Sequence, residues 1–194
     1  MSITANKVEN PCKVVTGVVR LSYANIWQPK SIKDGTPKYS TSVLIPKNDA
    51  VTVGKIKAAV EAAYREGENK LRGNAKSVPP LAAIKTPLRD GDLERPDDDA
   101  YKGCWFLNAN STTAPGVVNL AREPITDTSK IYSGVYARVS LAFFAYSTNG
   151  NRGVAAGLQH IQKVRDGEPL GGKSRAEDDF DDEFATEIDD DFLA

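Results

Sequence analysis

The sequence contains little cysteine and histidine, and it lacks long apolar runs. Its 194 residues include two cysteines, Cys12 and Cys104, and one histidine, His160. The cysteines are not spaced as metal ligands, and although they could pair, we expect two buried thiols in a reducing compartment. No apolar run approaches the roughly 18–20 residues that cross a bilayer. The first residues also lack the apolar core of a secretory signal. We therefore expect neither a membrane span nor a secretory leader.

Sequence motifs of catalysis are also missing. The chain has no G-x-x-x-x-G-K-[ST] loop, no H-E-x-x-H and no paired C-x-x-C. We interpret His160, on an expected strand, as structural rather than as a general base. The carboxylates at 97–99 could hold Mg²⁺ for a nuclease, but carboxylates in a Pro-flanked loop are usually only solvated. The prediction is a protein that is not an enzyme and that has no cofactor and no metal site.

Charge is distributed very unevenly along the chain. From Glu177 to the end there are ten acidic residues and no basic one. The other 16 acidic residues face all 25 Lys and Arg, which gives residues 1–176 a net charge of +9. A basic body joined to an acidic segment points to a polyanionic ligand for the body.

Hydrophobic periodicity predicts a mainly β protein with one helix. Alternating and β-branched residues predict five strands, with Gly17 as a bulge or bend in the first: 13–23, 38–46, 103–111, 132–147 and 153–165. Helical spacing of apolar residues predicts a helix over 49–66, between Asn48 or Asp49 as N-cap and Gly67. Residues 67–100 are polar and broken by prolines, which is typical of a loop. This order suits a five-stranded Greek-key barrel of the oligonucleotide-binding (OB) type, although another antiparallel α+β sheet also fits.

Two units are expected along the chain: an OB-fold domain over 1–172 and a disordered acidic tail over 173–194. The tail cannot bury enough apolar surface to fold alone. Its end, with Asp189, Asp190, Asp191 and Phe192, is typical of a peptide that docks on a basic pocket of a partner. It could also occupy the basic groove of the body as a mimic of phosphates, or act only as a solubilising tail.

The body carries the residue types that a single-strand-binding surface requires. Such a surface needs cations for phosphates and exposed rings on which bases stack. The candidates are Arg20, Lys38, Tyr39, Tyr101, Trp105, Tyr132, Tyr136, Arg138 and Arg152. Each also has a structural interpretation. Tyr136 and Arg138 could form an ordinary strand-surface pair, and Trp105 and Tyr39 could belong to the core.

Several segments of the chain resemble a known family. They are SGVYARVSLAFFAY (133–146), GNRGVAAGLQHIQKVRDGEPLGG (150–172), PKYSTSVLIPK (37–47) and the acidic tail. Together they resemble phage-encoded single-stranded-DNA-binding proteins, a group long labelled as of unknown function. The resemblance implies an OB fold and sequence-independent binding to single-stranded DNA in phage replication or recombination, in the cytoplasm of the infected host cell. It also implies that the tail contacts replication or recombination proteins and competes with DNA.

Other function classes stay open at this point. A Mg²⁺-dependent nuclease would use Asp97–Asp99, and a virion or scaffold protein would use the basic body to bind packaged nucleic acid or an acidic neighbour. The sequence leaves open whether the chain forms a homodimer, and it predicts no membrane partner.

Overall fold

The computed structural model of the chain describes residues 9–31 and 35–171. The predicted acidic tail, including Asp189, Asp190, Asp191 and Phe192, lies outside the described residues. Among the described residues, no helix is long and apolar enough to cross a membrane.

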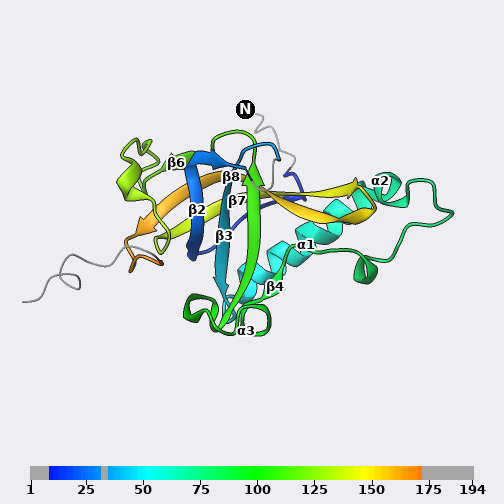
Figure 1. The fold of residues 1–194 in the computed structure, drawn as a ribbon, viewed down its shortest axis with the longest axis horizontal. Helices are drawn as coiled ribbons and strands as arrows, with labels where there is room; N and C mark the ends of the chain where they lie inside the picture. Colours follow the sequence, from blue (N-terminus) through cyan, green and yellow to red (C-terminus); the bar gives the residue numbers. More distant parts are fainter. Residues whose placement is uncertain (1–8, 32–34, 172–194) are drawn as a thin grey trace, which may run out of the picture.

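Five long strands close into a barrel (Figure 1). They are β2 (Val19–Lys30), β3 (Lys38–Pro46), β5 (Cys104–Ser111), β7 (Tyr136–Thr148) and β8 (Asn151–Arg165). The sheet order is β1-β7-β2-β3-β5-β8-β6, and β7 also pairs with β8, which completes the ring. Only β8 meets β5 in a parallel sense, whereas the other four barrel pairings are antiparallel. This arrangement confirms the predicted OB-like barrel.

Strand alternation explains the interior of the barrel. Val43 and Ile45 of β3 and Val139, Leu141 and Phe143 of β7 are all buried in one apolar cluster. Their neighbours in sequence face outward, because successive side chains of a strand point to opposite sides of the sheet. The alternation read from the sequence of 135–143 is therefore confirmed.

One long helix, α1 (Ala50–Glu66), covers part of the barrel and packs on β7 and β1 (Lys13–Val15). The Asp49 side chain accepts a hydrogen bond from Thr52 N at 3.0 Å, which satisfies a free donor of the first turn. Val53, Ile56, Val60 and Ala63 recur at helical spacing and are buried. The helix predicted at 49–66 is confirmed.

Two strand predictions differ from the structure. The segment 13–23 is divided into β1 and β2, with the break around Gly17, and β2 continues past the predicted end at 23 to Lys30. The strand predicted from 132 begins only at Tyr136, because residues 132–135 turn and Gly134 has φ 112°. The three-residue strand β6 (Gly116–Val118), which pairs with β8, was too short to be indicated by its pattern.

The polar segment 67–100 is largely irregular, as predicted, but it holds short elements. These are α2 (Glu68–Arg72), β4 (Arg89–Asp90), α3 (Gly91–Glu94) and 3₁₀ turns at Leu81–Ala83 and Asp99–Tyr101. A further 3₁₀ turn spans Thr128–Lys130. The segment is tied to the barrel where β4 pairs with β5 and where Val154 N donates to Lys85 O at 2.8 Å.

Candidate nucleic-acid interface

A groove of about 670 Å³ lies across β2, β3 and β5. Short polar side chains follow the strands here: Asn25, Ser40, Ser42, Asn108 and Asn110. The register explains why they gather, because Ser42 lies opposite Asn108, and Ser40 lies opposite both Asn110 and Asn25. Directly paired residues share a face of the sheet, so these side chains make a continuous polar floor on the outside of the barrel. We call this site the outer groove.

An exposed ring and a guanidinium form one wall of the outer groove. Tyr23 is 57 % exposed and has φ 47°, a rare backbone conformation for a bulky residue. The register between β2 and β3 shifts after Ser22, and this irregularity re-aims the Tyr23 side chain. The Arg95 guanidinium lies 5.7 Å from the Tyr23 ring centroid, in cation–π geometry. A base could therefore meet a ring and a cation side by side.

Two lysines stand at the other end of the outer groove. Lys30 and Lys38 both line it and are directly opposite each other on β2 and β3. Like charges opposite one another destabilise a strand pair. An anion bound beside both ammonium groups would relieve that repulsion.

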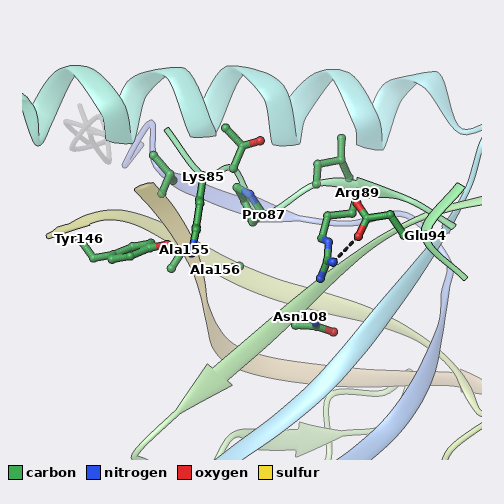
Figure 2. A pocket seen from close by; sticks show the side chains of 11 residues that line it. Lys85, Pro87, Arg89, Glu94, Asn108, Tyr146, Ala155 and Ala156 are labelled. Carbon is green, nitrogen blue, oxygen red and sulfur yellow. Dashed lines mark ion pairs between the residues drawn. The ribbon is translucent and has the colours of Figure 1, made fainter. Parts of the chain in front are cut away.

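A second hollow of about 560 Å³ adjoins the outer groove, and Asn108 lines both. The paired ends of β7 and β8 around the turn at 149–150 form an arm. We call the hollow the arm pocket, because Tyr146, Ala155 and Ala156 of this arm line one side of it. Arg89 and Glu94 line the other side, and Lys85 lies beside the arm, where its backbone pairs with Gly153. Figure 2 shows Arg89 and Glu94 joined by an ion pair above β5, with Tyr146 at the far end of the hollow.

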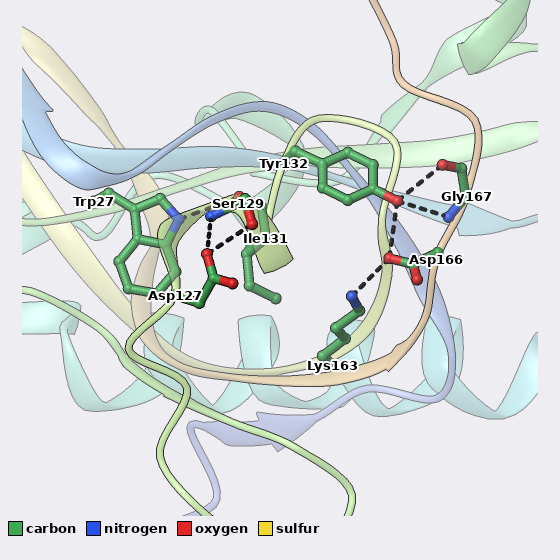
Figure 3. A network of polar contacts seen from close by, with 8 residues as sticks. All are labelled: Trp27, Asp127, Ser129, Ile131, Tyr132, Lys163, Asp166 and Gly167. Carbon is green, nitrogen blue, oxygen red and sulfur yellow. Dashed lines mark hydrogen bonds and ion pairs between the residues drawn. The ribbon is translucent and has the colours of Figure 1, made fainter.

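A different tyrosine-rich region surrounds the end of β8. Residues 166–171, which we call the strap, follow β8 and pack against the turn at 132–135 and against Tyr136. The Tyr132 hydroxyl lies 3.0 Å from both Asp166 Oδ1 and Gly167 O, and Gly167 N donates to it at 3.1 Å (Figure 3). Lys163 Nζ lies 2.6 Å from Asp166 Oδ1. The Lys163 ammonium, with help from the Tyr132 hydroxyl, holds the pKa of Asp166 below its usual value.

The strap covers Tyr136. Its ring lies between two guanidinium groups, with Arg165 at 3.6 Å and Arg20 at 5.3 Å from the ring centroid. Gly167 packs on the same ring, and a Cβ at this position would lie 2.7 Å from it. Arg20 is itself held by the strap, since its Nη2 donates to Glu168 O at 2.6 Å.

The structure thus separates the residues that the sequence suggested for one surface. Lys38 lines the outer groove, whereas Arg20, Tyr132 and Tyr136 belong to the strap network. Tyr101 is fully buried, its ring packs edge-on against Phe106, and its hydroxyl donates to Ser42 Oγ at 3.0 Å. The prediction for Tyr101 is therefore corrected, because a base cannot reach a ring with no exposed surface.

The remaining candidates lie outside the outer groove. Trp105 is half-buried beside α1, beneath Lys47 at 5.2 Å and Lys57 at 5.9 Å. Arg138 donates to Thr16 O at 3.2 Å. Tyr39 is half-buried on β3, where alternation directs it away from Lys38 and Ser40. Arg152 is the second residue of β8, and its carbonyl oxygen accepts a hydrogen bond from Lys85 N.

Sequence reasoning missed Tyr23, Arg95 and the polar floor. A signal for the floor was present, since Ser40 and Ser42, like Asn108 and Asn110, recur at every second position within strands. Such alternation marks a polar face. Tyr23 and Arg95 carry no comparable signal, because a strand irregularity and a loop bring them together.

The other chemical candidates offer little. Among the described residues, Cys12 and Cys104 are free thiols, and burial raises the pKa of Cys12 to about 11. The exposed His160 accepts from Gly116 N at 3.3 Å through Nδ1. No three His, Cys, Asp or Glu side chains of residues 9–31 and 35–171 are grouped to hold a metal ion. Asp98 caps a 3₁₀ turn by accepting a hydrogen bond from Ala100 N at 3.2 Å.

Known proteins match the chain over most of its length. Putative protein p50 of Acyrthosiphon pisum secondary endosymbiont phage 1 is 30% identical over 179 residues, which cover 88% of this chain and 93% of that protein. The structure of the single-stranded DNA-binding protein from bacteriophage Enc34 in complex with ssDNA matches with a TM-score of 0.68 and 25% identity. That match covers 82% of this chain and 90% of the other.

A more distant structure shares the fold. The single-stranded DNA-binding protein gp2.5 of bacteriophage T7 has a TM-score of 0.59 at 16% identity, over 84% of this chain and 97% of that one. Residues 12–193 also match the family described as Enterobacter phage Enc34, ssDNA-binding protein. Because this match spans nearly the whole sequence, the chain belongs to the Enc34 family of phage single-stranded-DNA-binding proteins.

Proposed function

We propose that this protein binds single-stranded DNA without sequence preference and that the strand lies in the outer groove. The observation that carries the proposal is the pairing of an exposed Tyr23 ring with the Arg95 guanidinium above a polar strand floor. A ring of this kind accepts any base, because every base has a π-face. The relative solved in complex with ssDNA supports the same ligand.

Different residues of the groove contact the bases and the phosphate backbone. The Tyr23 ring stacks on a base, while Arg95, Lys30 and Lys38 neutralise phosphates. The Asn side chains of the floor and Ser40 offer hydrogen bonds that do not select one base, whereas the buried Ser42 accepts from Tyr101. Contacts of this kind position a strand without reading its sequence.

The wider role is also part of the proposal. We infer that the protein coats and protects single strands during phage DNA replication or recombination, in the cytoplasm of the infected bacterium. The acidic tail, with Asp189–Asp191 and Phe192, recruits replication or recombination proteins and competes with DNA for the basic body. Its ten acidic residues against a body of +9 make the contact between the tail and the body electrostatically favourable, which supports the competition with DNA.

The test is fluorescence anisotropy of labelled oligo(dT), compared with a duplex of equal length over a range of salt concentrations. Tyr23→Ala is expected to weaken oligo(dT) binding by about 1–3 kcal/mol, roughly 5- to 150-fold, because one stacking platform is lost. Tyr23→Phe keeps the ring and should bind as the wild type does. Melting temperatures should stay close to wild type, since the side chain is exposed.

Two results would contradict the proposal. If the wild-type protein did not bind oligo(dT), or bound duplex equally well, single-strand binding would be wrong. If it bound oligo(dT) but Tyr23→Ala bound equally well, the ligand would be right and the outer groove would be the wrong place.

A further inference from the structure

The ion pair between Arg89 and Glu94 lies in the arm pocket (Figure 2). The arm pocket shares Asn108 with the outer groove. Glu94 is the only acidic side chain among the described residues that line this pocket, whereas Lys85 and Arg89 are cationic. A pocket that continues a polyanion-binding groove gains nothing from a carboxylate, because the carboxylate repels phosphates. The presence of Glu94 beside Arg89 in this pocket therefore needs an explanation.

We propose that the arm pocket is a second phosphate-binding segment and that Glu94 holds the Arg89 guanidinium until a backbone phosphate of the strand replaces it. The inference rests on the proposed binding of single-stranded DNA in the outer groove. It assigns the arm pocket a ligand, a nucleic-acid phosphodiester, and it gives Glu94 the role of an internal competitor.

The geometry places the two sites on one path. Asn108 lines both hollows, and the consecutive residues Glu94 and Arg95 line the arm pocket and the outer groove respectively. A strand that leaves the Tyr23–Arg95 wall therefore meets the Arg89–Glu94 pair next. Tyr146 and Lys85 stand farther along the same pocket and offer a ring and a cation for the continuation.

Arg89 is built to change partners without moving far. It lies opposite Phe106 in the β4–β5 pairing, and its guanidinium is 5.1 Å from the Phe106 ring centroid. This cation–π contact orients the guanidinium plane whichever anion it binds. A phosphate matches the fork of Arg donors with two parallel hydrogen bonds, as a carboxylate does.

The ion pair is also weak enough to be exchanged. The Arg89 and Glu94 side chains are 47% and 38% exposed, so solvent screens their attraction. Lys47 provides a contrast, because it is bound by Asp90 at 2.7 Å and by Asp92 at 2.8 Å. A phosphate would have to displace two carboxylates from Lys47 but only one from Arg89.

The experiment compares the full-length variants Glu94→Gln and Glu61→Gln in anisotropy titrations with labelled oligo(dT). Glu61 is a matched control, because it forms an exposed ion pair with Arg65 on α1 and lines neither hollow of the path. An exposed pair contributes up to about 1 kcal/mol, so Glu94→Gln should tighten binding by up to about fivefold at low salt. Glu61→Gln should change it by less than about twofold, and both differences should shrink as salt rises.

Arg89→Ala completes the test as a double-mutant cycle. It should weaken binding, and adding Glu94→Gln to it should have no further effect, because the competitor then has nothing to release. Equal affinities for Glu94→Gln and Glu61→Gln would overturn the competitor role. Wild-type affinity in Arg89→Ala would remove the arm pocket from the path while leaving the outer groove intact. A wild-type protein that did not bind oligo(dT) would overturn both proposals.

Discussion

The outer groove and the strap region contain similar residues but differ in what covers them. Each combines tyrosine and arginine, with Tyr23 and Arg95 in the groove and with Tyr136, Arg20 and Arg165 near the strap. Tyr23 is 57 % exposed, whereas Tyr136 is flanked by two guanidinium groups and Gly167. A tyrosine beside an arginine is therefore a ligand platform in one region and a packing unit in the other. The deciding factor is a distant segment that covers one of them.

Gly134→Ala, next to the strap, is expected to have the largest effect on stability. Gly134 has φ 112°, and a Cβ there would lie 2.1 Å from Glu168 O. Backbone strain and overpacking together should cost about 3 kcal/mol of unfolding free energy, measured by urea denaturation. Gly54→Ala is the control, because Gly54 lies in α1 with open space around it and alanine favours a helix. An unchanged stability of Gly134→Ala would mean that the strap does not hold this turn.

Tyr136→Ala sharpens the comparison with Tyr23→Ala. Loss of the half-buried Tyr136 ring should lower the unfolding free energy by about 2 kcal/mol, less than a fully buried aromatic side chain. Affinity for oligo(dT), measured under conditions where the variant is folded, should stay near wild type. If Tyr136→Ala kept wild-type stability but lost affinity for oligo(dT), the DNA would bind in the strap region and not in the outer groove.

Removing an arginine from the outer groove should change the salt dependence of DNA binding, whereas removing one from the strap region should not. Arg95→Ala should flatten the log–log salt dependence of oligo(dT) binding by about 0.7, the slope for one phosphate contact on a single strand. Arg165→Ala removes the same charge from the strap region and should leave the slope unchanged. Anisotropy titrations at several salt concentrations measure both, and equal slopes for the two variants would contradict the division between the regions.

The smallest expected effect concerns pH and Asp166. Because Lys163 lowers the pKa of Asp166 in the folded protein, the ionised carboxylate stabilises the fold above the ordinary pKa of an aspartate, about 3.9. This contribution is lost as pH falls through the lowered pKa. Asp166→Asn should therefore be less stable than wild type near neutral pH, and the difference should shrink in urea denaturation at acid pH. If the stability difference between Asp166→Asn and wild type grew at acid pH, Lys163 would not be the partner that stabilises the Asp166 carboxylate.

The fold was predictable where a pattern is regular over many residues. The helix at 49–66 and the strand at 38–46 agree with α1 and β3 almost residue for residue, because their apolar residues repeat at one period. The strand expected from 132 starts late because a turn at Gly134 interrupts the alternation. The short strands β4 and β6 have too few residues for any period to be visible.

The candidate site was predictable in kind but not in place. A basic body, available rings and the family resemblance all point to single-strand binding from the sequence alone. Of the nine body residues suggested, however, only Lys38 lines the outer groove. Tyr101, for instance, follows a run of acidic residues and gives no hint in the sequence of its fully buried position.

The sequence by itself determined the positions of the barrel strands and the helix and the charge asymmetry, because these depend on local periodicity and composition, and the family resemblance added the class of ligand. Only the tertiary structure decided which rings face solvent. Arg20 and Glu168 are 148 positions apart, yet their contact helps to hold the strap over Tyr136. Exposure depends on such long-range contacts, since a side chain is covered by whichever segment the fold brings to it, however far away that segment lies in the sequence.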